Sequence, residues 1–486
     1  MDMPANPVWQ QRLFLGSWKS GNGEQINVTE PATGEVISQL KAATPSDVDR
    51  AATTARDAQT QWVAVPFDQK AEILRKAATL LKERADEING WNTRECGSIG
   101  PKADWELQAT YEQAQMAAAL PMQPSGEIFP SNMPGKRNYW KRVPIGTVGV
   151  IAPWNFPILL AMRSVFPALA MGNCVILKPD PKSSICGGVL MAKILEDAGL
   201  PEGVFHVLPG GPDVGQALVE HPLVKMISFT GSTAVGKKIG ETCGRMLKKA
   251  ALELGGNNAQ VVLEDADLDI ASSCGAWGSF LHQGQICMQT GRHLVHRSVA
   301  DEYIERLAAR AGNLACGNPA QEQAHLGPLI NEAQAKRVED IVNRSVEMGA
   351  RIVVGGKRNG NYYEATVMSD VTPDMPVFSE EVFGPVAPVM TFDSDDNACS
   401  LVNESLYGLA AAIHSRSTER ALQIANQIQV GMIHINDQTV NNEFQVPFGG
   451  LGSSGNSGRF GGPANIEEFT TSQWVSVMEK GIQYPF

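Results

Sequence analysis

The sequence lacks any long apolar stretch: no window approaches the roughly 18 uninterrupted apolar residues that suggest a membrane-spanning helix. Its first residues show neither the basic segment nor the apolar core of a secretory signal, so we expect none. Basic residues are the minority charge, since 40 Lys and Arg stand against 52 Asp and Glu, a net charge of −12. This balance argues against nucleic acid or an anionic membrane as a partner.

Metal-ligand and disulfide patterns are missing as well. The eight cysteines form no C-x-x-C pair, and together with the eight histidines they show no metal-ligand spacing. We therefore expect no metal site, and a reducing cytoplasm as the location. Fixed-period repeats, low-complexity segments and the G-x-G-x-x-G dinucleotide fingerprint are also absent.

Strands and helices alternate through most of the 486 residues, a length that predicts two or three structural units. Apolar runs typical of buried parallel strands occur at 148–152, 174–179, 204–208 and 226–229, with helical segments between them. A second alternation of this kind begins after Gly256. The pattern predicts a doubly wound α/β fold, in which ligands bind at the carboxyl ends of the strands.

The N-terminal part is predicted to hold short strands over 1–45 and then three helices. The first helix is capped at Thr44, and apolar residues at helical spacing predict the others at 67–89 and 103–120. Their apolar faces require a sheet to cover, which marks these helices as packing elements.

Residues 122–144 interrupt the helical pattern with several prolines, and 137–143 alternate like an exposed strand. Such a strand has unpaired edges, which oligomers commonly satisfy by pairing across subunits. The alternative is an edge strand within one subunit. The segment 468–477 alternates in the same way and is a candidate to pair with it.

Cys287 is the candidate nucleophile. It follows Gly284-Gln285-Ile286, and these residues favour a thiol presented on a loop. A catalytic thiol needs a base and an oxyanion donor, for which Glu253 and Asn155 are candidates. Each residue also has an ordinary structural explanation: Cys287 as a small buried cysteine, Glu253 as a solvated glutamate and Asn155 as a turn residue. Only their combination indicates attack on a carbonyl.

Two strand ends carry candidate cofactor contacts. Lys178 closes one apolar strand and offers a fixed cation for ribose hydroxyls or phosphate. Residues 229–236 run from a strand through Thr230-Gly231-Ser232 into a helix, whose N-terminus would suit a pyrophosphate. The alternative is an ordinary helix cap.

Taken together, the motifs resemble those of the NAD(P)-dependent aldehyde dehydrogenases. The resemblance covers essentially the whole chain and is carried, in order, by Pro153-Trp154-Asn155-Phe156-Pro157, Phe229-Thr230-Gly231-Ser232, Glu253-Leu254-Gly255-Gly256, Gly284-Gln285-Ile286-Cys287, Glu381-Val382-Phe383-Gly384-Pro385 and Pro447-Phe448-Gly449-Gly450. Within the family the chain is most similar to the bacterial benzaldehyde dehydrogenases, through segments such as Phe280-Leu281-His282-Gln283 and His434-Ile435-Asn436-Asp437-Gln438.

The resemblance implies an aldehyde dehydrogenase-like α/β fold with three parts. A Rossmann-type cofactor domain would comprise 1–121 and 145–255, and a catalytic domain 256–450. A small β oligomerisation arm would comprise 122–144 and 466–486, which implies a homodimer or homotetramer.

The resemblance also implies roles for the candidate residues. Cys287 would attack the aldehyde to give a thiohemiacetal, and Asn155 with the backbone N–H of Cys287 would hold the oxyanion. Hydride transfer to the nicotinamide would leave a thioester, which Glu253 would hydrolyse by activating water. The implied cofactor contacts are Ile151, Trp154, Lys178, Gly211, Gly231, Ser232, Glu381 and Phe383.

One position departs from the family pattern. The family often has a glutamate three positions after the lysine of the Lys178 strand, where it bonds the adenosine ribose; here that position is Pro181. Asp180 is a possible substitute, whereas Lys182 would favour a 2′-phosphate. We expect NAD from the likeness to benzaldehyde dehydrogenases, with NADP as the alternative.

The substrate pocket is expected beside the nucleophile and the oxyanion amide. Apolar and aromatic lining there suits a small aromatic aldehyde, and the candidates are Phe156, Leu160, Arg163, Ile286, Met288 and Phe448. Arg163 either positions a polar ring substituent or is an ordinary surface or ion-paired arginine, the commoner situation on a helix.

Other functions remain to be distinguished. A thioesterase or a coenzyme-A-acylating dehydrogenase would use similar parts, but Glu253 favours hydrolysis to the free acid. A binding or structural protein that has lost activity is the non-enzymatic alternative. The presence together of Cys287, Glu253, Asn155 and Lys178 argues against it.

Overall fold

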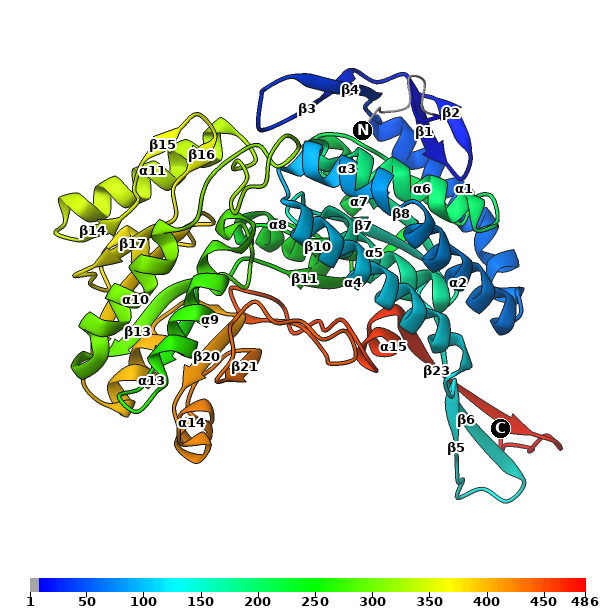
Figure 1. Cartoon of the computed structure of the whole chain (residues 1–486). Coiled ribbons are helices and arrows are strands. Elements are labelled where there is room, and N and C mark those ends of the chain that lie inside the picture. The colour runs from blue at the N-terminus through cyan, green and yellow to red at the C-terminus, as the bar shows by residue number, and fades with distance from the viewer. Residues whose placement is uncertain (1–7) are drawn as a thin grey trace.

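The computed structural model describes residues 8–486. Residues 1–7, on which the expectation of no secretory signal rests, lie outside this range. Within it, Figure 1 shows two α/β bodies side by side and a narrow arm that projects from one of them. No helix in the described range is long and apolar enough to cross a membrane; the cytoplasmic location stays a prediction.

The first body is built on a seven-stranded sheet. Its strands, in spatial order, are β11 (Lys249–Glu253), β10 (Val224–Thr230), β7 (Thr147–Ile151), β8 (Cys174–Lys178), β9 (Phe205–Val207), β1 (Arg12–Leu15) and β2 (Trp18–Ser20). The five strands from β11 to β9 are parallel, and β1 and β2 add an antiparallel edge. The chain runs outward from β7 to β9 and then returns to β10 on the other side of β7. The strand order therefore reverses between β7 and β10, where α/β sheets bind ligands at the carboxyl edge.

The second body is built on another seven-stranded sheet. Its strands, in spatial order, are β14 (Arg351–Val354), β17 (Thr366–Ser369), β18 (Val386–Phe392), β13 (Thr290–His296), β12 (Asn258–Val262), β20 (Ala410–His414) and β21 (Met432–Ile435). Because β11 ends at Glu253 and β12 begins at Asn258, the carboxyl edge of the first sheet leads directly into the amino edge of the second. This junction places the candidate catalytic residues.

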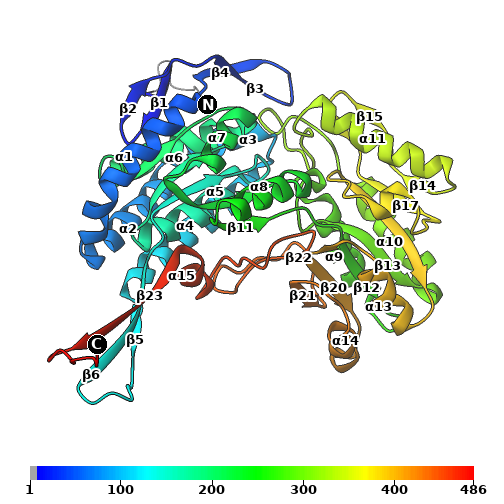
Figure 2. The ribbon, with the colours of Figure 1, turned by 180° about the vertical axis from the view of Figure 1, so that it is seen from behind.

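Helices pack around both sheets (Figures 1 and 2). They are α1 (Pro45–Ala64), α2 (Phe67–Glu83), α3 (Ala85–Cys96), α4 (Gly100–Ala119), α5 (Pro157–Ala170), α6 (Leu190–Asp197), α7 (Pro212–Glu220), α8 (Thr233–Arg245), α9 (Leu268–Phe280), α10 (Ala300–Gly312), α11 (Glu332–Glu347), α12 (Pro376–Ser379), α13 (Asp395–Asn403), α14 (Thr418–Ala425) and α15 (Ala464–Phe469). The predicted cap is confirmed: Thr44 and Asp47 form a reciprocal capping box at the start of α1.

Two predicted helices are wrong in detail. The single helix expected over 67–89 is divided at Arg84, whose φ of −107° and ψ of 23° are not helical. The helical segment expected between the strands at 174–179 and 204–208 opens with a π-helical turn at Ile185–Val189 before α6. No proline or glycine marks the first break.

The arm is a three-stranded antiparallel sheet in the order β23-β6-β5, whose strands are labelled in Figure 1. It consists of β5 (Gly126–Phe129), β6 (Lys136–Pro144) and β23 (Thr470–Met478). The expected pairing of the C-terminal segment with the strand near residue 140 is confirmed, since Trp474 lies opposite Trp140. Three two-stranded antiparallel pairs complete the described strands. Two are hairpins: β3 (Gln25–Thr29) with β4 (Val36–Lys41), and β15 (Arg358–Asn359) with β16 (Tyr362–Tyr363). The third joins strands distant in sequence, β19 (Tyr407–Gly408) and β22 (Leu451–Gly452).

The domain boundaries stay a proposal. In their support, the two large sheets take their strands from either side of residue 255, and each has its own apolar core. The arm strands lie within the two segments assigned to the arm.

Candidate active site

Cys287 lies on a strained loop between α9 and β13. His282, Gln283 and Gly284 in succession have positive φ angles of 49°, 57° and 69°, which costs energy for the two residues that are not glycine. The Asn258 side chain holds the far side of the loop, because its Nδ2 donates to the carbonyl of Cys287 at 2.9 Å. Thr439 Oγ1 donates to the carbonyl of Met288 at 2.7 Å. These contacts fix the backbone at Cys287 and at the residue after it.

Asn155 comes to the nucleophile loop from the other sheet. It follows β7 and precedes α5, is 4% exposed, and donates from Nδ2 to the carbonyl of Gln285 at 2.8 Å. This contact joins the two proposed partners of the oxyanion: the Asn155 amide and the loop that presents the backbone N–H of Cys287. Asn155 and Cys287 are 132 positions apart in the sequence.

Glu253 ends β11 and is 2% exposed, and its Oε1 has no hydrogen-bond partner among the described residues. Burial raises the pKa of this carboxyl to about 8, against the lowering effect of the Arg163 and Arg459 charges. A carboxyl with a pKa near neutrality suits a general base. Glu253 does not line the large cavity described below, so here its carboxyl lies behind the site.

The Cys287 thiol is partly exposed at the end of that cavity. Burial of the thiol raises its pKa to about 12. The Arg163 charge lowers this pKa, whereas the nearby Glu253 and Glu381 carboxyls raise it. The thiol therefore needs added positive charge or a base before it can act as a thiolate.

A cavity of about 850 Å³ opens at Cys287 and Asn155. It is lined by all six residues predicted for the substrate pocket: Phe156, Leu160, Arg163, Ile286, Met288 and Phe448. Further apolar lining that the sequence did not indicate comes from Trp105, Leu159, Trp277, Leu281 and Val440. These residues come from α4, α5, the α9 end and a C-terminal loop, and no local motif marks them.

Five of the proposed cofactor residues lie at the carboxyl edge of the first sheet. Ile151 and Lys178 lie opposite one another at the ends of β7 and β8, and Lys178 is 7% exposed. Gly211 and Ser232 are the N-cap residues of α7 and α8, with Gly231 just before. The Ser232 hydroxyl makes no capping hydrogen bond, so the ordinary cap is not its role here. Two helix N-termini and a buried lysine at one sheet edge fit a dinucleotide pyrophosphate and ribose.

Glu381, Phe383 and Trp154 lie at the junction of the two bodies. Glu381 Oε1 accepts a hydrogen bond from the backbone N–H of Gly256 at 2.9 Å, and burial raises the pKa of this carboxyl to about 7. Phe383 has a positive φ of 53° and its ring meets that of Trp154 edge-on at 5.7 Å. Polar and aromatic groups thus bound the far end of the proposed cofactor site.

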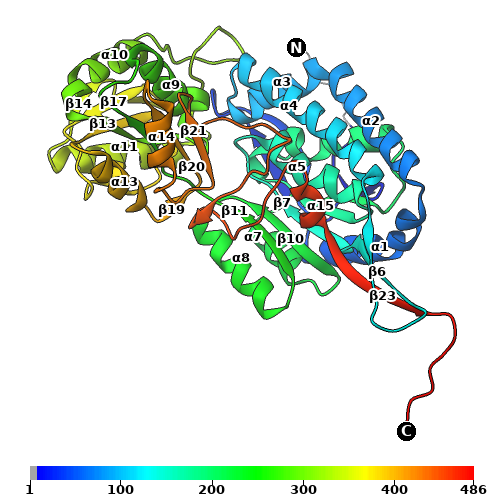
Figure 3. The same ribbon diagram turned by 90° about the horizontal axis from the view of Figure 1, so that it is seen from below.

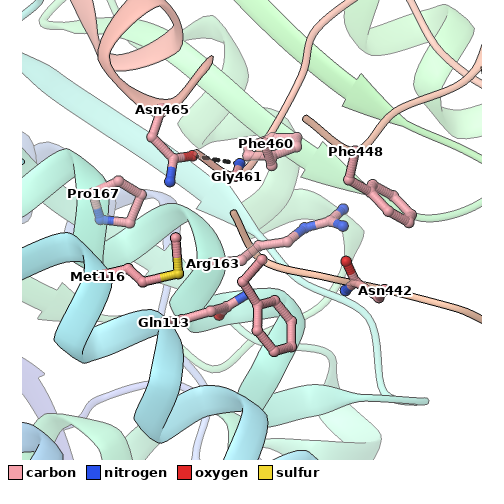
Figure 4. A pocket seen from close by; sticks show the side chains of 10 residues that line it. Gln113, Met116, Arg163, Pro167, Asn442, Phe448, Phe460, Gly461 and Asn465 are labelled. Carbon is pink, nitrogen blue, oxygen red and sulfur yellow. Dashed lines mark hydrogen bonds between the residues drawn. The ribbon is translucent and has the colours of Figure 1, made fainter. Parts of the chain in front are cut away.

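Arg163 differs from the commoner expectation of a surface or ion-paired arginine. It is 5% exposed, and no carboxylate of the described chain lies within 4.0 Å of its guanidinium. Its Nη2 donates instead to Thr230 Oγ1 at 2.9 Å. The side chain packs under Phe448 and Phe460, with Gln113 and Asn442 nearby (Figure 4).

A thiol and an amide line one cavity, a carboxyl is buried behind it, and the carboxyl edge of the first sheet suits a dinucleotide; together these features indicate a class of oxidoreductase. A model of the aldehyde dehydrogenase family matches residues 18–475, and the chain belongs to this family. The predicted aldehyde dehydrogenase-like fold is thereby confirmed, and the family uses NAD(P).

Two relatives and one solved structure show which members of the family this chain resembles. The benzaldehyde dehydrogenase (NAD(+)) of Pseudomonas putida is 56% identical over 480 residues, 99% of each chain. The vanillin dehydrogenase of an Amycolatopsis species is 51% identical over 98% of each chain. Among solved structures, a salicylaldehyde dehydrogenase from Pseudomonas putida G7 complexed with salicylaldehyde superimposes with a TM-score of 0.95 at 32% identity, covering 98% of this chain and 99% of the other.

Proposed function

We propose that this enzyme oxidises small aromatic aldehydes to carboxylic acids with NAD. The observation that carries the proposal is the apolar and aromatic cavity that ends at Cys287 and Asn155. The relatives support it, since three of them are named for benzaldehyde, vanillin and salicylaldehyde.

The chain's own residues supply the acyl chemistry. The Cys287 Sγ bonds to the aldehyde carbon, and Asn155 Nδ2 with the backbone N–H of Cys287 holds the oxygen that becomes negative. When bound, the nicotinamide supplies the hydride acceptor. Glu253 then takes a proton from the water that attacks the thioester, which releases the acid and restores the thiol. Because Glu253 lies behind the cavity here, its side chain turns toward Cys287 for this step.

The cofactor preference rests on the loop after β8. Asp180 is already engaged, because its carboxylate accepts from the backbone N–H of Lys182 at 2.9 Å and its Oδ1 lies 3.5 Å from Lys182 Nζ. This pairing partly neutralises the lysine that would attract a 2′-phosphate. Together with the NAD(+) in the name of the Pseudomonas putida relative, it supports NAD over NADP.

The arm supports a proposal of assembly as a homodimer or homotetramer. Its outer strands β5 and β23 leave backbone groups unpaired, and Ile128 and Trp474 on them are 75% and 69% exposed. Exposed apolar side chains on an open sheet edge are typical of a subunit interface.

The test is a panel of aromatic and aliphatic aldehydes assayed for NADH or NADPH formation without coenzyme A. We expect the highest kcat/KM with benzaldehyde-type substrates and NAD. Higher kcat/KM for aliphatic aldehydes would refute the substrate class. Preference for NADP would refute only the cofactor assignment, and a requirement for coenzyme A would indicate acyl transfer instead of hydrolysis.

A further inference from the structure

The Arg163 guanidinium is a buried cation whose charge is not matched by an ion pair in the described chain. Its Nη2 has Thr230 Oγ1 as a neutral partner at 2.9 Å, and its Nε has no hydrogen-bond partner. A buried charge without an opposite charge ordinarily destabilises the fold. Such a residue is retained more easily where a negative charge forms beside it during function.

Aromatic rings and one strand pair hold the guanidinium in place. Its central carbon lies 5.2 Å from the Phe448 ring centroid and 4.7 Å from that of Phe460, and the two phenylalanines are bridged through their backbones. Thr230, which accepts from Arg163, lies directly opposite Glu253 in the register of β10 and β11. The hydroxyl therefore anchors the cation next to the strand position of the proposed base.

Arg163 borders two cavities at once. One is the large cavity that ends at Cys287. The other is a small cavity of about 20 Å³ on the other side of the side chain, where Gln113 Oε1 also lacks a hydrogen-bond partner (Figure 4). A water needs about 10–15 Å³, so this cavity has room for one water near Arg163 Nε and Gln113 Oε1, which have no hydrogen-bond partner among the described residues. Neither neighbour there is an anion.

The other charged groups around the site are already paired or carry raised pKa values. On the far side of Glu253, Glu468 accepts from the backbone N–H of Arg459 at 3.4 Å and lies 3.4 Å from Lys249 Nζ. Arg459 lowers the pKa of Glu253 and Glu468 raises it. The Arg163 charge lowers the pKa of the Cys287 thiol, whereas the Glu253 and Glu381 carboxyls raise it.

We propose that Arg163 is a positioning residue that supplies one fixed positive charge for two anions that form in turn, the Cys287 thiolate during attack and the Glu253 carboxylate during hydrolysis. The inference rests on the proposed function and deepens it. The structure shows the cation without an ion-pair partner in the described chain. Each deprotonation then gives it one, so the buried cation stabilises the two reactive states relative to the resting state.

The test compares Arg163→Met, which removes the charge at similar length, with Arg163→Lys, which keeps it. Gln113→Met is the matched control, because it alters the same small cavity without changing charge. The first readout is the rate of Cys287 alkylation by iodoacetamide against pH, without aldehyde or cofactor. The second is the pH profile of steady-state turnover with benzaldehyde and NAD.

For Arg163→Met we expect both midpoints to move to higher pH by on the order of one unit, the effect of one nearby opposite charge. Arg163→Lys should restore at least half of each shift, and Gln113→Met should keep the wild-type midpoints. Unchanged midpoints in Arg163→Met, or a loss confined to KM and shared by Arg163→Lys, would overturn the proposal.

Thr230→Val provides a second variant in case Arg163→Met does not fold. It keeps the charge but removes its anchor beside Glu253, so we expect a smaller alkaline shift of the turnover profile; an unchanged profile would count against the proposal. The alkylation readout needs no substrate. Failure of the wild type to oxidise aromatic aldehydes would therefore refute the proposed function and leave the role of Arg163 to be decided by alkylation.

Discussion

Burial raises the pKa values of Cys287 and Glu253 to about 12 and about 8, which favours the protonated form of both groups. The two groups have to lose their protons at different steps. Since a protonated carboxyl cannot accept a proton from water, Glu253 is active as a base only above its folded-state pKa.

The pH dependence of turnover follows from the raised pKa of Glu253. For the wild type, we expect turnover limited by acid release to rise as the pH passes through about 8, where Glu253 loses its proton. Glu253→Gln should lose this rise. Steady-state rates measured from pH 6 to 10 in both proteins test the assignment, and a retained rise in the variant would place the titrating group elsewhere.

At the residue scale, short motifs in the sequence indicated the candidate nucleophile, amide and carboxyl, because they fix the chemical types and the order of these residues; their catalytic roles stay a prediction. It could not give the surroundings of Arg163, since Thr230, Phe448 and Phe460 approach it from distant segments. The same holds for Trp105 and Trp277 in the cavity.

At the scale of elements, a buried network ties α4 to the N-terminus of α5. Glu106 Oε1 accepts from the backbone N–H groups of Ile158 and Leu159, at 2.8 and 3.1 Å, and its Oε2 accepts from Lys102 Nζ at 2.6 Å. These bonds satisfy donors that the first turn of a helix leaves free. Because Asn155 directly precedes α5, the network also fixes the loop of the proposed oxyanion donor.

Removal of Glu106 should therefore be costly. We expect Glu106→Ala to lower the free energy of unfolding by about 3–5 kcal/mol, since it leaves the Lys102 charge and two backbone donors buried without their acceptor. Lys102→Met should cost less than half of that, because Glu106 keeps its other donors. Urea unfolding of both variants tests the ranking; equal costs would show that the ion pair, and not the helix cap, dominates.

Element types were largely predictable, because apolar runs and helical spacing report burial directly. The division at Arg84 was not, since it carries no proline or glycine and depends on how α2 and α3 pack. The short strand β11 also carries no distinctive pattern of its own, although it places Glu253.

At the scale of the whole molecule, the arm extends away from both bodies in all three views (Figures 1, 2 and 3). The sequence indicated its strands but left open whether they pair within one chain. The structure shows β6 between β5 and β23 of the same chain, with open edges on both sides. The number of subunits depends on contacts between chains, so the sequence pattern of one chain does not determine it.

Charge on the arm should disrupt the proposed assembly. We expect Trp474→Glu to shift the protein to a smaller species in light scattering coupled to size-exclusion chromatography, because it adds a charge to an apolar interface. Val63→Glu, at a side chain 44% exposed near the end of α1, is the matched control and should keep the wild-type mass. Equal masses for all three proteins would argue against an interface at Trp474.

The most direct test of the central claim is the mass of the Cys287 peptide after Glu253→Gln reacts with benzaldehyde and NAD. The account predicts a burst of about one NADH per active site and one benzoyl group on Cys287, because the thioester forms but its hydrolysis is slow. NADH formation without an acyl group on Cys287, or neither product from a folded variant, would contradict it.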